Sequence, residues 1–405
     1  MLRIVVPVAA KRYESSPFGN ELNEFCCWLQ DAGYSKRTTG GHLRRLFQVL
    51  MQRGCSLTGA VSREHLHHAF GRRCSSARRS RPFRATEWAY SRFLSSQGRL
   101  LERPTKDALA SIFDHYRDYL VEVHGFSRNT IAGRLVTASD FLRSTLRPGE
   151  STTALRRAHV DRYVVVKSAV LTRHSLRQMI GQLRGFLRFA AAKGLLVERL
   201  DVIDTPRIYR EELPPRALPW NVVQKLLRSV DRASISGWRD YAILHLMAYY
   251  GLRASEIAGL CLDSIDWVAK TCRIEQRKNH ADLVLPLSDK TISLLQRYVL
   301  RERGSDARPS LFLRIIAPSG GMKVGGVCAV FYRWAARSGS PLSGYSSYCL
   351  RHSFAMRLLQ RGVGVKAIGD LLGHKSMEAT CWYLRLDTVG LRPVALPLPQ
   401  ARAPR

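Results

Sequence analysis

An arginine and a glutamate stand three positions apart, directly after a glycine that is expected to end a helix. Gly251 occupies the helix-ending position, and the spacing of Arg253 and Glu256 places their side chains on one face of the next helix. A carboxylate there can fix the plane of a guanidinium, and the amides of a helix N-terminus favour a phosphate. The pattern therefore indicates a phosphate site, although an exposed surface ion pair has the same local pattern.

Two further groups of polar side chains follow near the C-terminus. Arg351 and His352 are adjacent, His374 follows Gly373, and Tyr383 comes nine positions after His374. These residue types can bind an anion, move a proton and attack an electrophile. Each also has a structural alternative, because a tyrosine in a short helix is often core packing and a histidine after a helix-ending glycine is often a cap.

Helices are expected to position the second and third groups. Apolar residues recur at helical spacing over Leu350–Arg361 and Val365–Leu372, and glycines follow both stretches. Ser376 is expected to open a last short helix that carries Tyr383.

A β-hairpin is the clearest strand signal in the chain. Thr271–Gln276 and Leu283–Leu287 are β-branched or alternating runs, and the polar stretch between them contains Lys278. The pattern places Lys278 at the hairpin tip, where most lysines are solvated charges.

In order and with their surroundings, these groups resemble the tyrosine recombinases, also called phage integrases. The resemblance covers Leu213 to Leu386, and the stretch from Gly125 to Thr130 is similar to the core-binding domain of that family. It implies a mainly α fold with a small antiparallel β-sheet, in which helical core-binding and catalytic domains clamp double-stranded DNA. The residues that carry it are Arg253, Lys278, Arg351, His374 and Tyr383.

The resemblance also implies a role for each residue. Tyr383 attacks the scissile phosphorus, and Arg253 and Arg351 stabilise the charge that develops on the phosphate oxygens. Lys278 protonates the leaving 5′ oxygen, and His374 hydrogen-bonds the phosphate or assists proton movement. Glu256 orients Arg253. The 3′-phosphotyrosyl product retains the energy of the broken bond, so the reaction needs no ATP, metal or other cofactor.

The sequence departs from the family pattern at one position. The family has a histidine three residues before the second arginine, and here that residue is Tyr348. The loss leaves the identity of the general base open. Tyr348 can donate a hydrogen bond to a phosphate oxygen, and His352 is expected to hold the local structure. We predict that Tyr348→His does not abolish recombination.

Breaks rich in proline and arginine, near Ser75–Arg84, Arg103–Thr105 and Thr205–Pro219, divide the chain. We expect a helical domain over residues 1–100, a helical core-binding domain over 105–205 and a catalytic domain with a C-terminal tail over 213–405. The first two share a weak repeat at an offset of 92 residues with one slip. Trp28-Leu29, Gly33-Tyr34-Ser35 and Thr38 parallel Tyr119-Leu120, Gly125-Phe126-Ser127 and Thr130. Two helical hairpins with similar turns can also resemble each other by chance.

The composition agrees with a DNA-binding protein. The chain has 64 Lys and Arg against 32 Asp and Glu, a formal net charge of +32, which favours a polyanionic partner. Its nine cysteines include no CxxC pair, and no apolar stretch is long enough for a membrane span or a secretion signal. We therefore expect a cytoplasmic protein without a membrane partner.

Several alternatives remain open at this point. The family implies a homotetramer on two DNA sites, with or without partner recombinases, and Val394–Leu398 is either an element passed to a neighbour or a frayed end. The element type (integrase, resolvase or transposase) and the recognition site are undetermined. Residues 1–100 bind either further DNA or a partner. Two other functions are a DNA-binding module without chemistry and a type IB topoisomerase.

Overall fold

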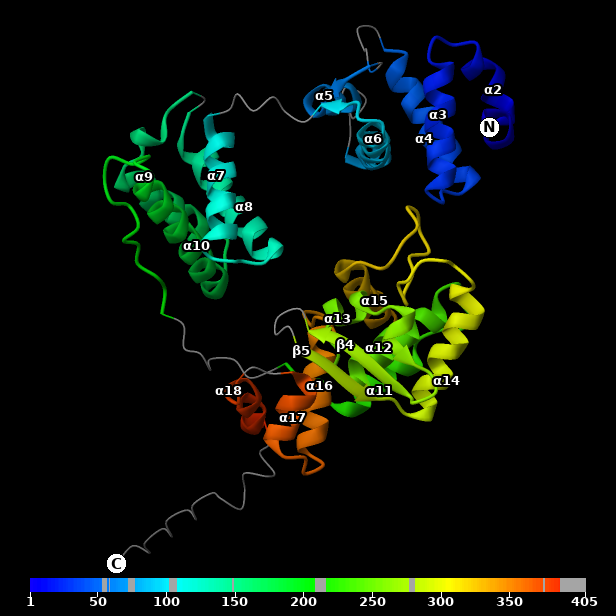
Figure 1. Ribbon diagram of the computed structural model, residues 1–405, viewed down its shortest axis with the longest axis vertical. Helices are drawn as coiled ribbons and strands as arrows, with labels where there is room; N and C mark the ends of the chain where they lie inside the picture. The colour runs from blue at the N-terminus through cyan, green and yellow to red at the C-terminus, as the bar shows by residue number, and fades with distance from the viewer. Residues whose placement is uncertain are drawn as a thin grey trace, which may run out of the picture. The chain divides into compact units, whose positions relative to one another are not determined.

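A computed structural model describes residues 1–52, 57, 59–71, 77–101, 108–147, 149–207, 216–276, 281–373 and 376–386 of the chain (Figure 1). These residues divide into two compact units. The first contains helices α1–α4, most of α6 and every element from α11 onward. The second contains β1, α5, β2 and α7–α10. The mainly helical fold with a small antiparallel sheet, predicted from the sequence, is confirmed.

The N-terminal part of the first unit is helical. Phe25, Tyr90 and Phe93 bury their rings between α3 and α6. The predicted break at Ser75–Arg84 is wrong from residue 77 onward, because α6 already begins there and includes Pro82 inside it; arginine, which dominates this stretch, is a good helix former. The helices are α1 (Leu2–Val5), α2 (Pro7–Glu14), α3 (Gly19–Asp31), α4 (Lys36–Leu50) and α6 (Ala77–Ser96).

The second unit contains the predicted helical bundle. Its core includes the fully buried Tyr116, Phe141 and Phe186, and Ser127 caps α8 by accepting a hydrogen bond from the backbone of Thr130. A short parallel strand pair, β1 with β2, was not predicted. The elements are β1 (Val61–Ser62), α5 (Arg63–Gly71), β2 (Leu100–Leu101), α7 (Ala108–Glu122), α8 (Arg128–Thr145), η1 (Thr152–Ala154), α9 (Arg157–Ser168) and α10 (Arg173–Ala192).

The C-terminal part of the first unit surrounds one long buried helix, α12, which packs against α11, α14, α15 and α16. Its elements are α11 (Trp220–Arg228), α12 (Gly237–Tyr250), α13 (Ala254–Gly259), η2 (Leu262–Ser264), β3 (Ile265–Asp266), β4 (Thr271–Gln276), β5 (Ala281–Pro286), α14 (Asp289–Tyr298), η3 (Val299–Arg303), α15 (Val324–Arg337), α16 (Tyr348–Leu359), α17 (Val365–Leu372), α18 (Glu378–Cys381) and η4 (Trp382–Leu386).

The predicted hairpin is confirmed. Strands β3, β4 and β5 form an antiparallel sheet, and Thr271 pairs with Pro286 while Gln276 pairs with Ala281. The second strand begins two residues earlier than expected, because backbone pairing continues past the alternating run. Lys278 lies between the strands in sequence, outside the described residues.

The last helices build a small second core. Figure 1 shows α16 and α17 side by side, with α18 beside α17. Met356, Ile368, Leu372 and Tyr383 are buried together there. The last helix begins at Glu378 rather than near Ser376, and Tyr383 itself lies in the 3₁₀ segment η4. This core, rather than a long helix, holds the tyrosine.

Candidate active site

A glycine turn places Arg253 and Glu256 at the start of α13. Gly251 ends α12 with a left-handed φ of 64°, and a Cβ there would come within 2.6 Å of a Phe354 ring carbon. The Glu256 carboxylate accepts a hydrogen bond from the backbone N–H of Arg253 at 2.8 Å and another from its guanidinium at 2.5 Å. Glu256 is buried, so this pair is not the exposed surface pair considered as an alternative. The predicted orienting contact is present.

Arg351 is buried on α16, with 2% of its surface exposed. Its Nη1 donates to the carbonyl of Gly251 at 2.7 Å, and its Nη2 donates to the carbonyl of Leu372. These carbonyls lie at the C-terminal ends of α12 and α17, where the helix dipole places partial negative charge. Nη1 also lies 4.0 Å from the Glu256 carboxylate. Burial, and then the charge of Arg253, lower the pKa of Arg351, but a guanidinium stays protonated in proteins.

Tyr383 and His352 meet through their polar atoms. Nδ1 of His352 lies 2.9 Å from the Tyr383 hydroxyl, and Tyr383 is only 3% exposed. Burial, and then the charge of Arg351, lower the pKa of His352 to about 4. The imidazole is therefore neutral at physiological pH and can accept a proton.

The tyrosine lies within the field of both arginines. Burial raises the pKa of the Tyr383 phenol, and Tyr348 adds to this effect. The positive charges of Arg351 and Arg253 act in the opposite direction and lower it. The two guanidinium groups therefore favour the phenolate that a nucleophilic tyrosine must become.

Tyr348 is the first residue of α16 and is 45% exposed. Its ring meets the ring of His352 edge-on, with centroids 4.6 Å apart and an interplanar angle of 89°. Tyr348 thus packs against the ring of His352, and its exposure leaves the side chain open to a bound ligand.

The structure brings six of the eight predicted site residues together: Arg253, Glu256, Tyr348, Arg351, His352 and Tyr383. Lys278 and His374 lie outside the described residues. Sequence reasoning missed the contact of His352 with Tyr383. The adjacency of His352 to Arg351 was visible, but no sequence rule links it to a residue 31 positions away.

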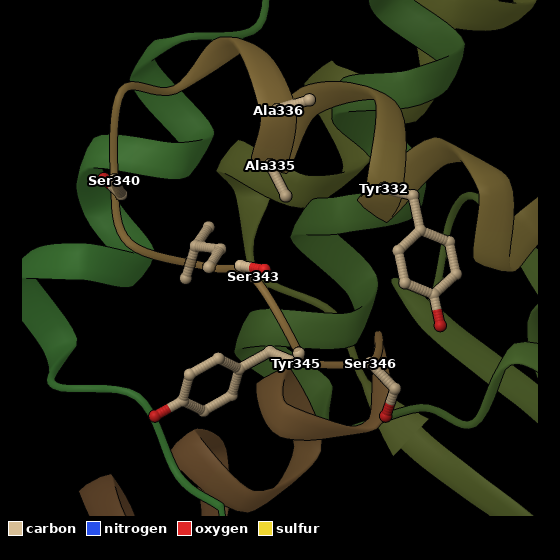
Figure 2. A pocket seen from close by; sticks show the side chains of 9 residues that line it. Tyr332, Ala335, Ala336, Ser340, Ser343, Tyr345 and Ser346 are labelled. Carbon is tan, nitrogen blue, oxygen red and sulfur yellow. The ribbon is translucent and has the colours of Figure 1, made fainter.

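A pocket of about 610 Å³ lies next to α15 and the loop before α16 (Figure 2). Hydroxyl-bearing side chains line much of it, among them Tyr332, Ser343, Tyr345 and Ser346. Its lining includes none of the six site residues. We therefore do not assign the chemistry to this pocket.

In the part of the chain that the structure describes, no helix combines the length and the apolar character that crossing a membrane requires.

Comparison with known proteins identifies relatives along almost the whole chain. Residues 216–389 match the model of the phage integrase family. The chain is 32% identical over 408 residues to the Sinorhizobium fredii protein y4rA, which is named as an integrase/recombinase. The match covers 96% of this chain and 97% of the relative. It is 30% identical to the tyrosine recombinase XerD of Mycobacterium leprae, over 72% of this chain and 97% of the relative.

Solved structures share the fold. A lambda integrase dimer bound to a COC′ core site matches with a TM-score of 0.54 and 16% identity, over 74% of this chain and 85% of that chain. The Tn1549 transposon integrase in complex with a circular intermediate DNA matches with a TM-score of 0.53 and 15% identity, over 67% of this chain and 94% of that chain. Together, the relatives and the folds show that the chain belongs to the tyrosine recombinases, the site-specific DNA recombinases also called phage integrases.

Proposed function

We propose that this recombinase cleaves and rejoins DNA through a 3′-phosphotyrosyl intermediate on Tyr383. One observation carries this assignment. The Tyr383 hydroxyl lies 2.9 Å from Nδ1 of the neutral His352 imidazole, and the positive charges of Arg253 and Arg351 act on it. A nucleophile, a proton acceptor and fixed positive charge are what attack of a hydroxyl on a phosphodiester requires.

In this proposal Arg253 and Arg351 bind the non-bridging oxygens of the scissile phosphate. Arg351 uses two donors on backbone carbonyls, which leaves further N–H groups of the guanidinium for an anion. Glu256 keeps the plane of Arg253 constant. Because both groups are oriented in advance, they stabilise the developing charge without first having to reorganise.

We propose that His352 is the general base of the cleavage step. The O–H bond of Tyr383 breaks and its proton moves to Nδ1 of His352, while the phenolic oxygen bonds to phosphorus and the bond from phosphorus to the 5′ oxygen breaks. The 5′ oxygen receives a proton from Lys278, the role that the family resemblance assigns to it. In religation the steps reverse, and protonated His352 returns the proton to Tyr383. His352 thus fills the role left open by Tyr348.

The finer biological role is also a proposal. We infer a homotetramer on two DNA segments, each held between a core-binding and a catalytic domain, with His374 contacting the phosphate. The dimer on DNA named in the lambda integrase structure and the circular intermediate named in the Tn1549 structure support assembly on DNA and movement of an element. Action in the cytoplasm fits the unpaired cysteines among the described residues.

The first experiment traps the intermediate. The purified full chain is incubated with nicked suicide duplexes that carry candidate sites from its genomic neighbourhood, and a denaturant-stable protein–DNA adduct is measured. We expect an adduct that Tyr383→Phe abolishes. An adduct that persists in Tyr383→Phe would refute the assignment of the nucleophile. Strong binding without any adduct would instead favour a DNA-binding module, and relaxation of plasmid without a cognate site would favour a topoisomerase.

A second experiment tests His352 separately. We expect His352→Ala to slow adduct formation by roughly 10²–10⁴-fold, the usual contribution of a general base, and added imidazole to restore part of the rate. A substrate with sulfur in place of the 5′ bridging oxygen needs no proton on its leaving group, so it should rescue Lys278→Ala but not His352→Ala. Equal rescue of both variants would place His352 on the leaving-group side and refute its role as base.

A further inference from the structure

The helices α3, α4 and α6 repeat the arrangement of α7, α8 and α10. In each set a left-handed glycine follows the first helix, Gly33 with φ 80° and Gly125 with φ 57°. Two residues later, Ser35 and Ser127 cap the second helix in the same way. A shared turn of this kind is common, so it does not establish a repeat by itself.

The buried aromatic side chains give a stronger correspondence. Phe25 of α3 meets Tyr90 of α6 with ring centroids 5.2 Å apart at 82°, and Tyr116 of α7 meets Phe186 of α10 with centroids 5.2 Å apart at 70°. Each first-helix ring also contacts a second aromatic ring three residues later in the last helix, in pairs that are tilted in both sets: Phe25 with Phe93 at 5.4 Å, and Tyr116 with Phe189 at 5.0 Å.

A polar contact between the second and last helices repeats as well. Nδ1 of His42 lies 2.9 Å from the hydroxyl of Thr86, and the hydroxyl of Thr137 donates to the Gln182 side-chain oxygen at 2.6 Å. His42 and Thr137 are 95 positions apart, and Thr86 and Gln182 are 96 apart. The aromatic pairs correspond at offsets of 91 and 96. The offset changes from helix to helix because the connecting loops differ in length. The same pairs of helix positions nevertheless contact each other in both copies.

The N-terminal copy is also the more basic one. Residues 1–100 carry 17 Lys and Arg against 6 Asp and Glu, whereas residues 105–205 carry 16 against 10. Two exposed basic positions recur in both copies: Lys36 corresponds to Arg128 at the start of the second helix, and Arg81 corresponds to Arg177 in the last helix. The N-terminal copy adds the exposed Arg37 beside the first position.

We propose that the N-terminal helices are a second core-binding unit that binds duplex DNA outside the segment held at the cleavage site. The proposal goes beyond the assigned chemistry but rests on the protein acting on DNA. Exposed arginine and lysine side chains at matching positions of the two copies are suited to contact DNA phosphates. The net charge of +11 over residues 1–100 favours a polyanion as the partner rather than a protein surface of mixed charge. A partner recombinase on this surface is the competing occupant.

The test uses the full chain on a long duplex whose cleavage position is known from mapping the protein–DNA adduct, whichever residue forms it. Hydroxyl-radical footprints and the salt dependence of binding are compared for Lys36→Gln/Arg37→Gln, for Arg81→Gln/Arg84→Gln and for wild type. We expect each double variant to lose protection in the flanking DNA, and the slope of log affinity against log salt to fall by about 2, since each phosphate contact contributes about 0.9. Adduct formation on a short core duplex should remain at the wild-type rate.

Arg3→Gln/Lys11→Gln is the matched control, because it removes the same charge from exposed residues outside the repeated helices. It should keep both the flank protection and the salt slope. Unchanged flank protection in both test variants would overturn the proposal, as would an equal loss in the control. Loss of tetramer assembly with intact flank protection would show a protein partner instead. None of these outcomes depends on whether Tyr383 is the nucleophile, which the Tyr383→Phe adduct assay decides.

Discussion

The arginines and the tyrosine of the site are held by different kinds of structure. Arg351 is tied to the backbone carbonyls that end two helices, and Arg253 is tied to a buried carboxylate one turn ahead of it. Tyr383 lies in a short 3₁₀ segment and its hydroxyl meets a side chain, His352. The contrast suggests that the charges are set before DNA binds, whereas Tyr383, the proposed nucleophile, is positioned by a contact that can exchange a proton.

Among substitutions that alter how the arginines are held, the largest effect should come from replacing the arginine that depends on backbone geometry. Lysine cannot reach two carbonyls with a planar fork, so we expect Arg351→Lys to reduce single-turnover cleavage by about 10²–10³-fold, as for loss of one preorganised donor. Arg357→Lys on the same helix is the matched control, since its guanidinium lies over the Trp220 ring, 3.7 Å from the centroid. A similar loss in both variants would indicate damage to α16 and remove the distinction.

The next prediction concerns the turn that presents one of those carbonyls. Gly251→Ala adds a methyl group within 2.6 Å of Phe354 and 2.8 Å of Leu372, at a φ of 64°. We expect a loss of about 2–4 kcal/mol in the free energy of unfolding, because backbone strain and overpacking add. Gly362→Ala has a φ of 76° but meets nothing within 4 Å, so it should lose only about 1–2 kcal/mol. Denaturant unfolding measures both, and equal losses would show that the close packing at Gly251 is unimportant.

A third prediction concerns how the stability of the fold depends on pH through His352, the contact of Tyr383. The pKa of His352 is about 4 in the folded protein, against 6.5 for a histidine exposed to water. Between these values the unfolded chain binds a proton that the folded chain does not, so stability falls as pH decreases through this window and is unaffected above it. We expect wild type to lose on the order of 1–2 kcal/mol more than His352→Gln between about pH 7 and pH 5. Equal losses would mean that the imidazole is not kept neutral by burial.

The sequence predicted most of the part of the site that holds Arg253. Gly251, Arg253 and Glu256 follow helix-capping rules that act over a few residues, and the structure has the predicted contact. The bounds of α17 and β4 also agree with the predicted ones. Local rules suffice there because the contacts are local.

The parts that sequence reasoning missed depend on distant residues. The Arg351 fork reaches carbonyls 100 and 21 positions away, and no pattern in the chain marks a backbone oxygen as an acceptor. The sequence showed the N-terminal repeat only over Trp28–Thr38, around its first turn, because other core positions hold different residues, such as Phe25 where the other copy has Tyr116. The two copies share the geometry of their aromatic contacts but differ in the residue types that make them.

The smallest effect should come from Tyr348, which contacts His352 but not the Tyr383 hydroxyl through any hydrogen bond among the described residues. We expect Tyr348→Phe to change single-turnover cleavage by less than about threefold, because an edge-on ring contact contributes only about 0.5–1.5 kcal/mol and phenylalanine keeps it. Tyr348→His should remain active, since His352 still holds the proton-accepting position. If Tyr348→Phe instead lost activity as severely as His352→Ala, the phenol of Tyr348 would have to contact the phosphate, and the nucleophile side of the site would depend on two side chains rather than on His352.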